Sequence, residues 1–188
     1  NDLSVSVECL CICLRPCTDH IYREAYTQVI GGYGGIMEYL IRKAVVQDVL
    51  QMQELINGYA DAGAMLPRSL SELYDNIRDF TVCVSSDRLL GCCALHVCWT
   101  GLAEIASFAV RQDAHHHGIG SQLLHASIGE AEGLGIDTVF TLTRVPDYFR
   151  GYGFVEVDKG TLPHKVWSGC IKCPKFPDCD EVAMVKRL

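Results

Sequence analysis

The chain has 188 residues and a formal net charge of −7 at pH 7, with 49% hydrophobic and 21% charged residues. This length suffices for one domain with a sizeable core, and the composition is typical of a globular protein. The acidic balance argues against nucleic acid as a partner, because such binding depends on Lys and Arg neutralising phosphates. No apolar stretch reaches the length of a bilayer-spanning helix, so we expect no membrane association.

The N-terminal segment does not have the pattern of a secretory signal. Residues 3–14 are largely apolar, but Asp2 stands where a signal peptide carries positive charge. The eleven cysteines are odd in number, which argues against a complete disulfide framework and favours a reducing cytoplasm. The Gly-rich residues 31–35 indicate a boundary. We therefore predict a poorly ordered extension over residues 1–36 and one domain over residues 37–188.

Apolar periodicity and turn residues predict the elements of that domain. In chain order they are a strand at 39–45, helices at 46–62 and 70–80, antiparallel strands at 81–85, 89–100 and 102–110, a helix at 118–134, a strand at 138–142, a short helix at 146–152, and strands at 154–157 and 181–186. Ser69 and Glu72 have the spacing of a capping box, which places Arg68 at a helix entrance. The mixture of meandering strands and crossover helices predicts an α/β or α+β sheet with helices on its faces.

The most informative stretch is residues 104–124, where a predicted strand passes through a short loop into a helix start. Gly118 and Gly120 remove the side chains that would keep an anion away from this helix start. The first amides of a helix have no acceptor within it and lie at the positive end of the helix dipole, which suits a pyrophosphate. Gly-x-Gly after a strand is by itself a weak signal, so its surroundings decide the interpretation.

This loop resembles the phosphate-binding loop of the GNAT acetyltransferase superfamily, Arg/Gln-x-x-Gly-x-Gly/Ala. His115 stands where the family usually has Arg or Gln, and Gln112 replaces a common Pro. The segment from Tyr148 to Phe154 is similar to the family's second motif, an aromatic helix ending in Gly-Phe before a strand. The resemblance covers residues 37–188. It implies a mixed, mostly antiparallel central sheet with helices on both faces, and acetyl-CoA as co-substrate.

Three further stretches, residues 66–73, 140–149 and 162–181, resemble the short form of N-acetylglutamate synthase and related amino-acid acetyltransferases. This narrower likeness implies acetyl transfer from acetyl-CoA to the α-amine of L-glutamate, as in arginine biosynthesis. The acceptor would then be a small amino acid.

The resemblance also assigns roles to residues. It implies that the main chain of Phe108, Ala109 and Val110 hydrogen-bonds the pantetheine arm and the thioester oxygen. It also implies that the pyrophosphate is bound by the main-chain amides of His115, His116, His117, Gly118, Ile119, Gly120 and Ser121. Glu104 matches a common position for a general base acting through water, although a surface carboxylate at a strand end would look the same. The usual tyrosine acid is replaced by Phe149, so the neighbouring Tyr148 is a second-rank candidate.

A guanidinium is the natural partner for the acceptor's carboxylates because its donors match carboxylate geometry. Arg68 is the first candidate, both from the resemblance and from its place beside a helix N-terminus. Arg144 and Lys165 are second-rank candidates, and a solvated surface role is the alternative for each of them.

The cysteine-rich stretch near the C-terminus leaves one question open. Cys170, Cys173 and Cys179 with His164 could supply the ligands of a structural zinc. However, one short Cys-x-x-Cys lacks the second pair typical of such sites, so we expect reduced structural cysteines and no metal. Cys83, Cys92, Cys93 and Cys98 lie in predicted strands and are interpreted as small core residues.

Two other functions remain compatible with the sequence. One is acetyl transfer to another amine, such as a different amino acid, a polyamine or a protein N-terminus. The other is a non-catalytic CoA-binding or zinc-stabilised interaction module, in which His115 marks a degraded loop. The sequence is compatible with a homodimer but does not determine the oligomeric state.

Overall fold

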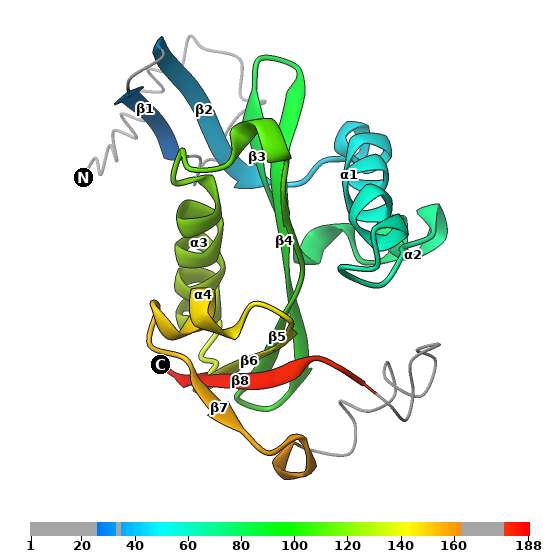
Figure 1. Ribbon diagram of the computed structural model, residues 1–188, viewed down its shortest axis with the longest axis vertical. Coiled ribbons are helices and arrows are strands. Elements are labelled where there is room, and N and C mark those ends of the chain that lie inside the picture. The colour runs from blue at the N-terminus through cyan, green and yellow to red at the C-terminus, as the bar shows by residue number, and fades with distance from the viewer. Residues whose placement is uncertain (1–25, 33–34, 163–178) are drawn as a thin grey trace, which may run out of the picture.

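The computed structural model describes residues 26–32, 35–162 and 179–188. This described part of the chain forms one eight-stranded sheet in the order β1-β2-β3-β4-β5-β6-β8-β7 (Figure 1). The strands are β1 Tyr26–Gly32, β2 Gly35–Lys43, β3 Phe80–Ser85, β4 Arg88–Trp99, β5 Leu102–Val110, β6 Thr138–Thr143, β7 Val155–Val157 and β8 Val182–Arg187. The α-helices are α1 Val49–Asp61, α2 Leu70–Asp75, α3 Ile119–Gly133 and α4 Pro146–Arg150. All neighbouring strands pair antiparallel except β5 and β6.

Helices cover both faces of the sheet, as expected. Helix α3 buries Ile119, Leu123 and Leu124 in a core that also includes the α4 residue Phe149. Helix α1 packs Met52 and Ile56 into the second core, on the other face of β3, β4 and β5. No helix among the described residues is long and apolar enough to cross a membrane.

The sheet begins earlier in the chain than the sequence predicted. Strand β1 lies within the expected N-terminal extension and pairs with β2 from Tyr26 opposite Ile41 to Gly32 opposite Gly35. Gly31, Gly32 and Gly35, part of the stretch interpreted as a boundary, therefore belong to paired strands. Glycine is typical of boundaries but also occurs within strands, so composition did not distinguish the two.

The second helix is shorter than the predicted span of residues 70–80. Helix α2 ends at Asp75, a 3₁₀ turn covers Ile77–Asp79, and the chain enters β3 at Phe80. Asn76 follows the last helical residue with φ −110° and ψ 20°, and its side-chain Nδ2 donates to the Glu72 carbonyl at 2.8 Å. This side-chain hydrogen bond takes up a carbonyl at the helix end and favours termination there.

Strands β5 and β6 pair only at their beginnings, and their separation creates the site. The parallel pairing covers Leu102–Glu104 of β5 and ends there. Further along β5, two residues, Ser107 and Phe108, lie opposite the single Cys93 of β4. Ser107 has φ 48°, a left-handed conformation rare for a residue with a side chain. This β-bulge bends β5 away from β6 and leaves one edge of β5 open.

Candidate active site

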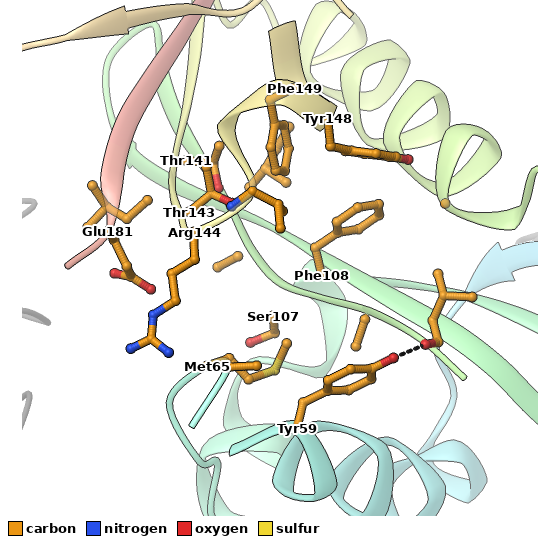
Figure 2. Close-up of a pocket in the computed structure, with 18 of the residues that line it drawn as sticks. Tyr59, Met65, Ser107, Phe108, Thr141, Thr143, Arg144, Tyr148, Phe149 and Glu181 are labelled. Atoms are coloured by element: carbon orange, nitrogen blue, oxygen red, sulfur yellow. Dashed lines mark hydrogen bonds between the residues drawn. The ribbon is translucent and has the colours of Figure 1, made fainter. Parts of the chain in front are cut away.

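A pocket of about 1190 Å³ lies where β5 and β6 separate (Figure 2). Its walls come from the α1–α2 loop, β5, the start of α3, the end of β6, α4 and the segment before β8. Of the predicted site residues it brings together Arg68, Glu104, Phe108, Ala109, Val110, His115, His116, Gly118, Ile119, Gly120, Arg144 and Tyr148. His117 and Ser121 do not line it, and Lys165 lies outside the described residues.

The start of α3 forms one end of the pocket. Gly118 precedes the helix with φ 74°, and the first helical hydrogen bond runs from the Gln122 amide to the Gly118 carbonyl at 3.1 Å. None of the described side chains caps this first turn. The amides of Ile119, Gly120 and Ser121 therefore have no acceptor within the helix and can donate to an anion.

The open edge of β5 presents main-chain groups to the pocket. The Arg111 amide donates to the Leu90 carbonyl of β4 at 2.8 Å. Because peptide groups alternate along a strand, the amide and carbonyl of Val110 face the opposite side, where β6 has diverged. The Val110 carbonyl accepts from the Tyr59 hydroxyl at 2.6 Å and contacts His115 Nε2 at 2.9 Å. A carbonyl only accepts, so Nε2 of His115 carries the proton.

Glu104 is a partly buried carboxylate at the last residue of the β5–β6 pairing. Burial raises its pKa above the ordinary glutamate value, because it disfavours the charged form. The nearby cation of Arg68 and the His96 ring lower that pKa, whereas Glu181 raises it. The net effect is upward, toward the range in which a carboxylate is an effective general base.

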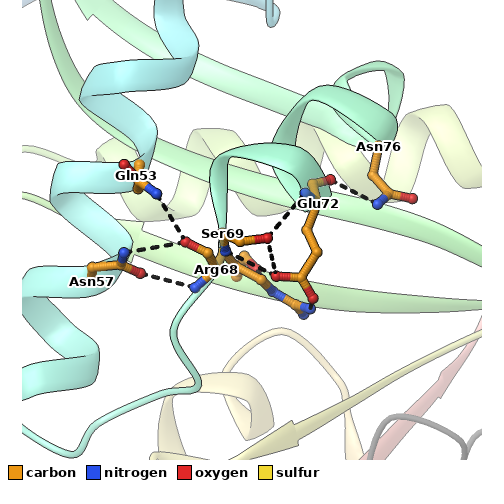
Figure 3. A network of polar contacts seen from close by, with 7 residues as sticks. Gln53, Asn57, Arg68, Ser69, Glu72 and Asn76 are labelled. Atoms are coloured by element: carbon orange, nitrogen blue, oxygen red, sulfur yellow. Dashed lines mark hydrogen bonds and ion pairs between the residues drawn. The ribbon is translucent and has the colours of Figure 1, made fainter.

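Arg68 is fixed at its main chain by helix α1 (Figure 3). Its amide donates to Asn57 Oδ1 at 2.9 Å, and its carbonyl accepts from Asn57 Nδ2 at 3.2 Å and from Gln53 Nε2 at 3.3 Å. The predicted capping box follows: the Glu72 amide donates to Ser69 Oγ, and the Ser69 amide donates to the Glu72 carboxylate. The chain is thereby held so that Arg68 enters the pocket.

The Arg68 guanidinium itself is loosely held. Its Nη1 lies 4.0 Å from Glu72 Oε1, and its Nε donates to Ser107 Oγ at 3.4 Å. The side chain is 36% exposed. Such a group can turn its donors to an incoming carboxylate at little cost.

Arg144, at the end of β6, differs from Arg68 in that its nitrogens are engaged. Nε and Nη2 donate to Asp180 Oδ1 at 3.2 and 2.8 Å, and Nη1 donates to the Gly63 carbonyl. In Figure 2 Arg144 and Glu181 lie at one end of the pocket, away from Tyr148.

Tyr148 packs among aromatic rings, 5.6 Å from Phe108 and 5.4 Å from Phe149 between ring centroids. Its hydroxyl is buried and has no hydrogen-bond partner among the described residues. Burial, followed by the neighbouring Tyr152, raises its pKa. The hydroxyl lies beside Gly120, at the helix-start end of the pocket.

The comparisons with known proteins agree with this geometry. Residues 47–155 match the acetyltransferase (GNAT) family. The chain belongs to the GNAT acetyltransferase family. An uncharacterized N-acetyltransferase from Chlorobaculum tepidum is 37% identical over 79% of this chain and 96% of its own length. An amino-acid acetyltransferase from Mycobacterium tuberculosis is 33% identical over 63% of this chain and 70% of its own length.

Among solved structures, N-acetylglutamate synthase from Neisseria gonorrhoeae, complexed with coenzyme A and N-acetyl-glutamate, superimposes with a TM-score of 0.74 at 27% identity. The similarity covers 85% of this chain but 36% of the gonococcal protein. The Mycobacterium tuberculosis protein Rv2747, in complex with CoA, superimposes with a TM-score of 0.68 at 27% identity, over 79% of this chain and 98% of its own. This GNAT chain is accordingly an acetyl-CoA-dependent N-acetyltransferase.

Several pocket residues of this GNAT enzyme, among them Tyr59, Ser107 and Glu181, were not predicted from the sequence as functional. Tyr59 lies within the helix predicted at 46–62 and Ser107 within the strand predicted at 102–110, yet both line the pocket. Glu181 was assigned to a strand end, and burial raises its pKa as well. A tyrosine in an amphipathic helix carries no functional signal, and the bulge at Ser107 has no local sequence pattern that identifies it.

The suggested zinc ligands fall mostly outside the described residues. His164, Cys170 and Cys173 are among those not described. Cys179 is a free thiol that lines the pocket and lies 3.9 Å from Glu181 Oε2. Within residues 26–32, 35–162 and 179–188, no group of three or more His, Cys, Asp or Glu side chains could hold a metal ion.

Proposed function

We propose that the enzyme transfers an acetyl group from acetyl-CoA to the α-amine of L-glutamate, forming N-acetylglutamate for arginine biosynthesis. The observation that carries the proposal is the presence of Glu104 and the loosely held Arg68 in one pocket with the uncapped start of α3. The names of the relatives support an amino-acid acceptor, and the gonococcal structure supports glutamate.

In this proposal the main chain holds the donor. The amides of the loop before α3 and of its first turn, from His115 to Ser121, bind the pyrophosphate. The open edge of β5, residues 108–110, pairs with the pantetheine arm and places the thioester carbonyl beside the pocket. Tyr59 and His115 already contact the Val110 carbonyl, so the arm would use the remaining groups of that edge.

The acceptor occupies the other half of the pocket. Arg68 binds a carboxylate through its guanidinium fork. Glu104, in its ionised form, accepts a proton from the ammonium of the amino acid through water. The freed amine attacks the thioester carbon, the C–N bond forms, and the C–S bond breaks to release CoA as a thiolate. Such a thiolate is a tolerable leaving group, because free thiols have a pKa of about 8.5. The nitrogen loses its remaining extra proton as the amide forms, and the thiolate gains one, with Tyr148 as the candidate that passes it on. Lys165 remains a candidate for the second carboxylate.

A second candidate is acetyl transfer to a different amine. The observation that favours it is that the Chlorobaculum tepidum relative, at 37% identity, is named only as an N-acetyltransferase. The first test is therefore CoA release from acetyl-CoA with each common amino acid, with polyamines and with short peptides. We expect glutamate to give the highest kcat/KM. Release with polyamines or peptides but with no amino acid would refute the acceptor class.

The role of Arg68 gives a sharper test of the acceptor site. In Arg68→Ala the Michaelis constant for glutamate should rise about ten- to a hundredfold, since a hydrogen bond to a charged group contributes about 1.5–3 kcal/mol. The Michaelis constant for acetyl-CoA should change little. Arg150→Ala is the control, because its guanidinium pairs with Asp147 and Glu156 outside the pocket. Equal increases for both substrates would contradict the assignment.

A further inference from the structure

Arg144 connects three segments that are distant in sequence. It directly follows β6, and its Nη1 donates to the carbonyl of Gly63, 81 residues earlier, in the loop between α1 and α2. Its Nε and Nη2 donate to Asp180, 36 residues later, in the segment that leads into β8. That α1–α2 loop lines the pocket with residues 64–68, and the segment before β8 lines it with Cys179 and Glu181.

The charges around Arg144 disfavour a direct role in binding a carboxylate. Asp180 Oδ1 already accepts from two nitrogens on one edge of the guanidinium, Nη2 at 2.8 Å and Nε at 3.2 Å. Glu181 is close enough for Arg144 to lower its pKa, although burial raises that pKa overall. One cation therefore lies between two acidic side chains and a main-chain carbonyl. A further carboxylate would meet repulsion and would have to displace an existing partner.

We propose that Arg144 is a positioning residue that ties the α1–α2 loop and the segment before β8 to the end of β6. It thereby fixes the segments that line the acceptor side of the pocket, and the acceptor's carboxylates bind without it. The inference rests on the proposed function in one respect, namely that this half of the pocket receives the amino acid. The sequence suggested Arg144 as a carboxylate ligand, and its contacts point to a different role.

The experiment compares Arg144→Gln with Asp180→Asn, because the two roles predict opposite outcomes for the second variant. If Arg144 positions the loop, each substitution loosens the same contact, and each raises the acceptor Michaelis constant by about three- to fivefold, as expected for a half-exposed ion pair. The Michaelis constant for acetyl-CoA stays near wild type. The double variant is no worse than the more affected single variant, because both substitutions remove one interaction.

If Arg144 instead binds the acceptor, Asp180→Asn removes a competitor. The acceptor Michaelis constant would then fall in Asp180→Asn while it rises in Arg144→Gln, and that result would overturn the proposal. Arg144→Lys adds a rescue test. A single ammonium lacks the fork that spans Gly63 and Asp180, so it should restore the constant only in part.

A second measurement does not depend on the acceptor's identity. Hydrogen exchange in peptides covering residues 62–68 should accelerate in both Arg144→Gln and Asp180→Asn, because the Gly63 carbonyl contact holds that loop. Glu156→Gln is the matched control. It removes another arginine–carboxylate contact, that of Arg150 Nη2 with Glu156 Oε2 at 2.6 Å, which lies outside the pocket. It should leave exchange at residues 62–68 unchanged. Unchanged exchange in both test variants would refute the positioning role. If the loop does loosen but glutamate is not a substrate, only the proposed acceptor fails.

Discussion

The pKa of Glu104 depends on the residues that surround its carboxylate. Its carboxylate is placed by β5 where burial raises its pKa, and the nearby Arg68 and His96 limit that rise. His96 lies directly opposite Glu104 on β4, and its Nδ1 donates a 2.8 Å hydrogen bond to the Asp79 carboxylate. The sequence identified Glu104 only by resemblance to the family, whereas these neighbours come from separate parts of the chain.

The variant Glu104→Gln separates activity from stability. Loss of a general base should lower kcat about 10²- to 10⁴-fold while acetyl-CoA binding is kept. The folded-state pKa of Glu104 is raised, so the folded protein holds this proton more tightly than the unfolded chain does. Stability from this group is therefore present at low pH and is lost as the pH rises through the raised pKa. Glu104→Gln should melt at a higher temperature than wild type at pH 8, with a smaller gain near pH 4. Calorimetry at both pH values measures this, and a lower melting temperature at pH 8 would contradict the assignment.

The start of helix α3 is determined by glycines in its local sequence. Gly118 and Gly120 predicted its N-terminus, and the helix begins at Ile119 with Gly118 in the left-handed conformation. A side chain at position 120 would meet the rings that close the pocket: an added Cβ would lie 2.8 Å from Tyr148 Oη and 3.3 Å from Phe108 Cζ. At Gly129, in the same helix, an added Cβ would meet nothing within 4 Å.

These two glycines provide a matched pair of substitutions. Gly120→Ala should raise the Michaelis constant for acetyl-CoA more than that for the acceptor, because the methyl group displaces Tyr148 and narrows access to the helix start. Gly129→Ala should leave both constants unchanged and stabilise the protein by about 0.5–1 kcal/mol, as alanine does in helix interiors. Steady-state kinetics and chemical denaturation measure the two effects. Equal kinetic behaviour of the two variants would refute a cofactor role for this turn.

The whole molecule is organised around the divergence of β5 and β6. Helices cover both faces of the sheet, and the divergence opens a pocket whose walls come from segments far apart in the chain. A ligand that contacts several of these segments stabilises the folded state, because the unfolded chain cannot bind it.

Acetyl-CoA should therefore protect the protein against thermal unfolding. At about 100 times its Kd the free energy of unfolding should increase by about 2.7 kcal/mol. Differential scanning calorimetry with and without acetyl-CoA measures the shift. Gly129→Ala should show the wild-type increase, and Gly120→Ala a smaller one at the same concentration. No increase for the wild type would contradict cofactor binding in this pocket.

The sequence by itself determined the features that depend on neighbours along the chain. Periodicity predicted most strands and helices, Ser69 and Glu72 predicted the capping box, and Gly118 and Gly120 predicted the helix start. Resemblance to the family supplied the order of the two motifs. Each of these signals is local, because hydrogen bonds within a few residues and the repeat of a helix or strand produce it.

The tertiary structure alone decided which distant residues meet. The pairing of β1 with β2 includes Gly31, Gly32 and Gly35, which the sequence alone presents as a boundary. The contact of Tyr59 with Val110 and that of Arg144 with Gly63 join residues 51 and 81 positions apart. Such contacts depend on the bulge at Ser107 and on the packing of helices against the sheet, which leave no periodic trace in the sequence. For this reason the sequence predicted where α3 begins, whereas only the fold distinguished the loosely held Arg68 from the fully engaged Arg144.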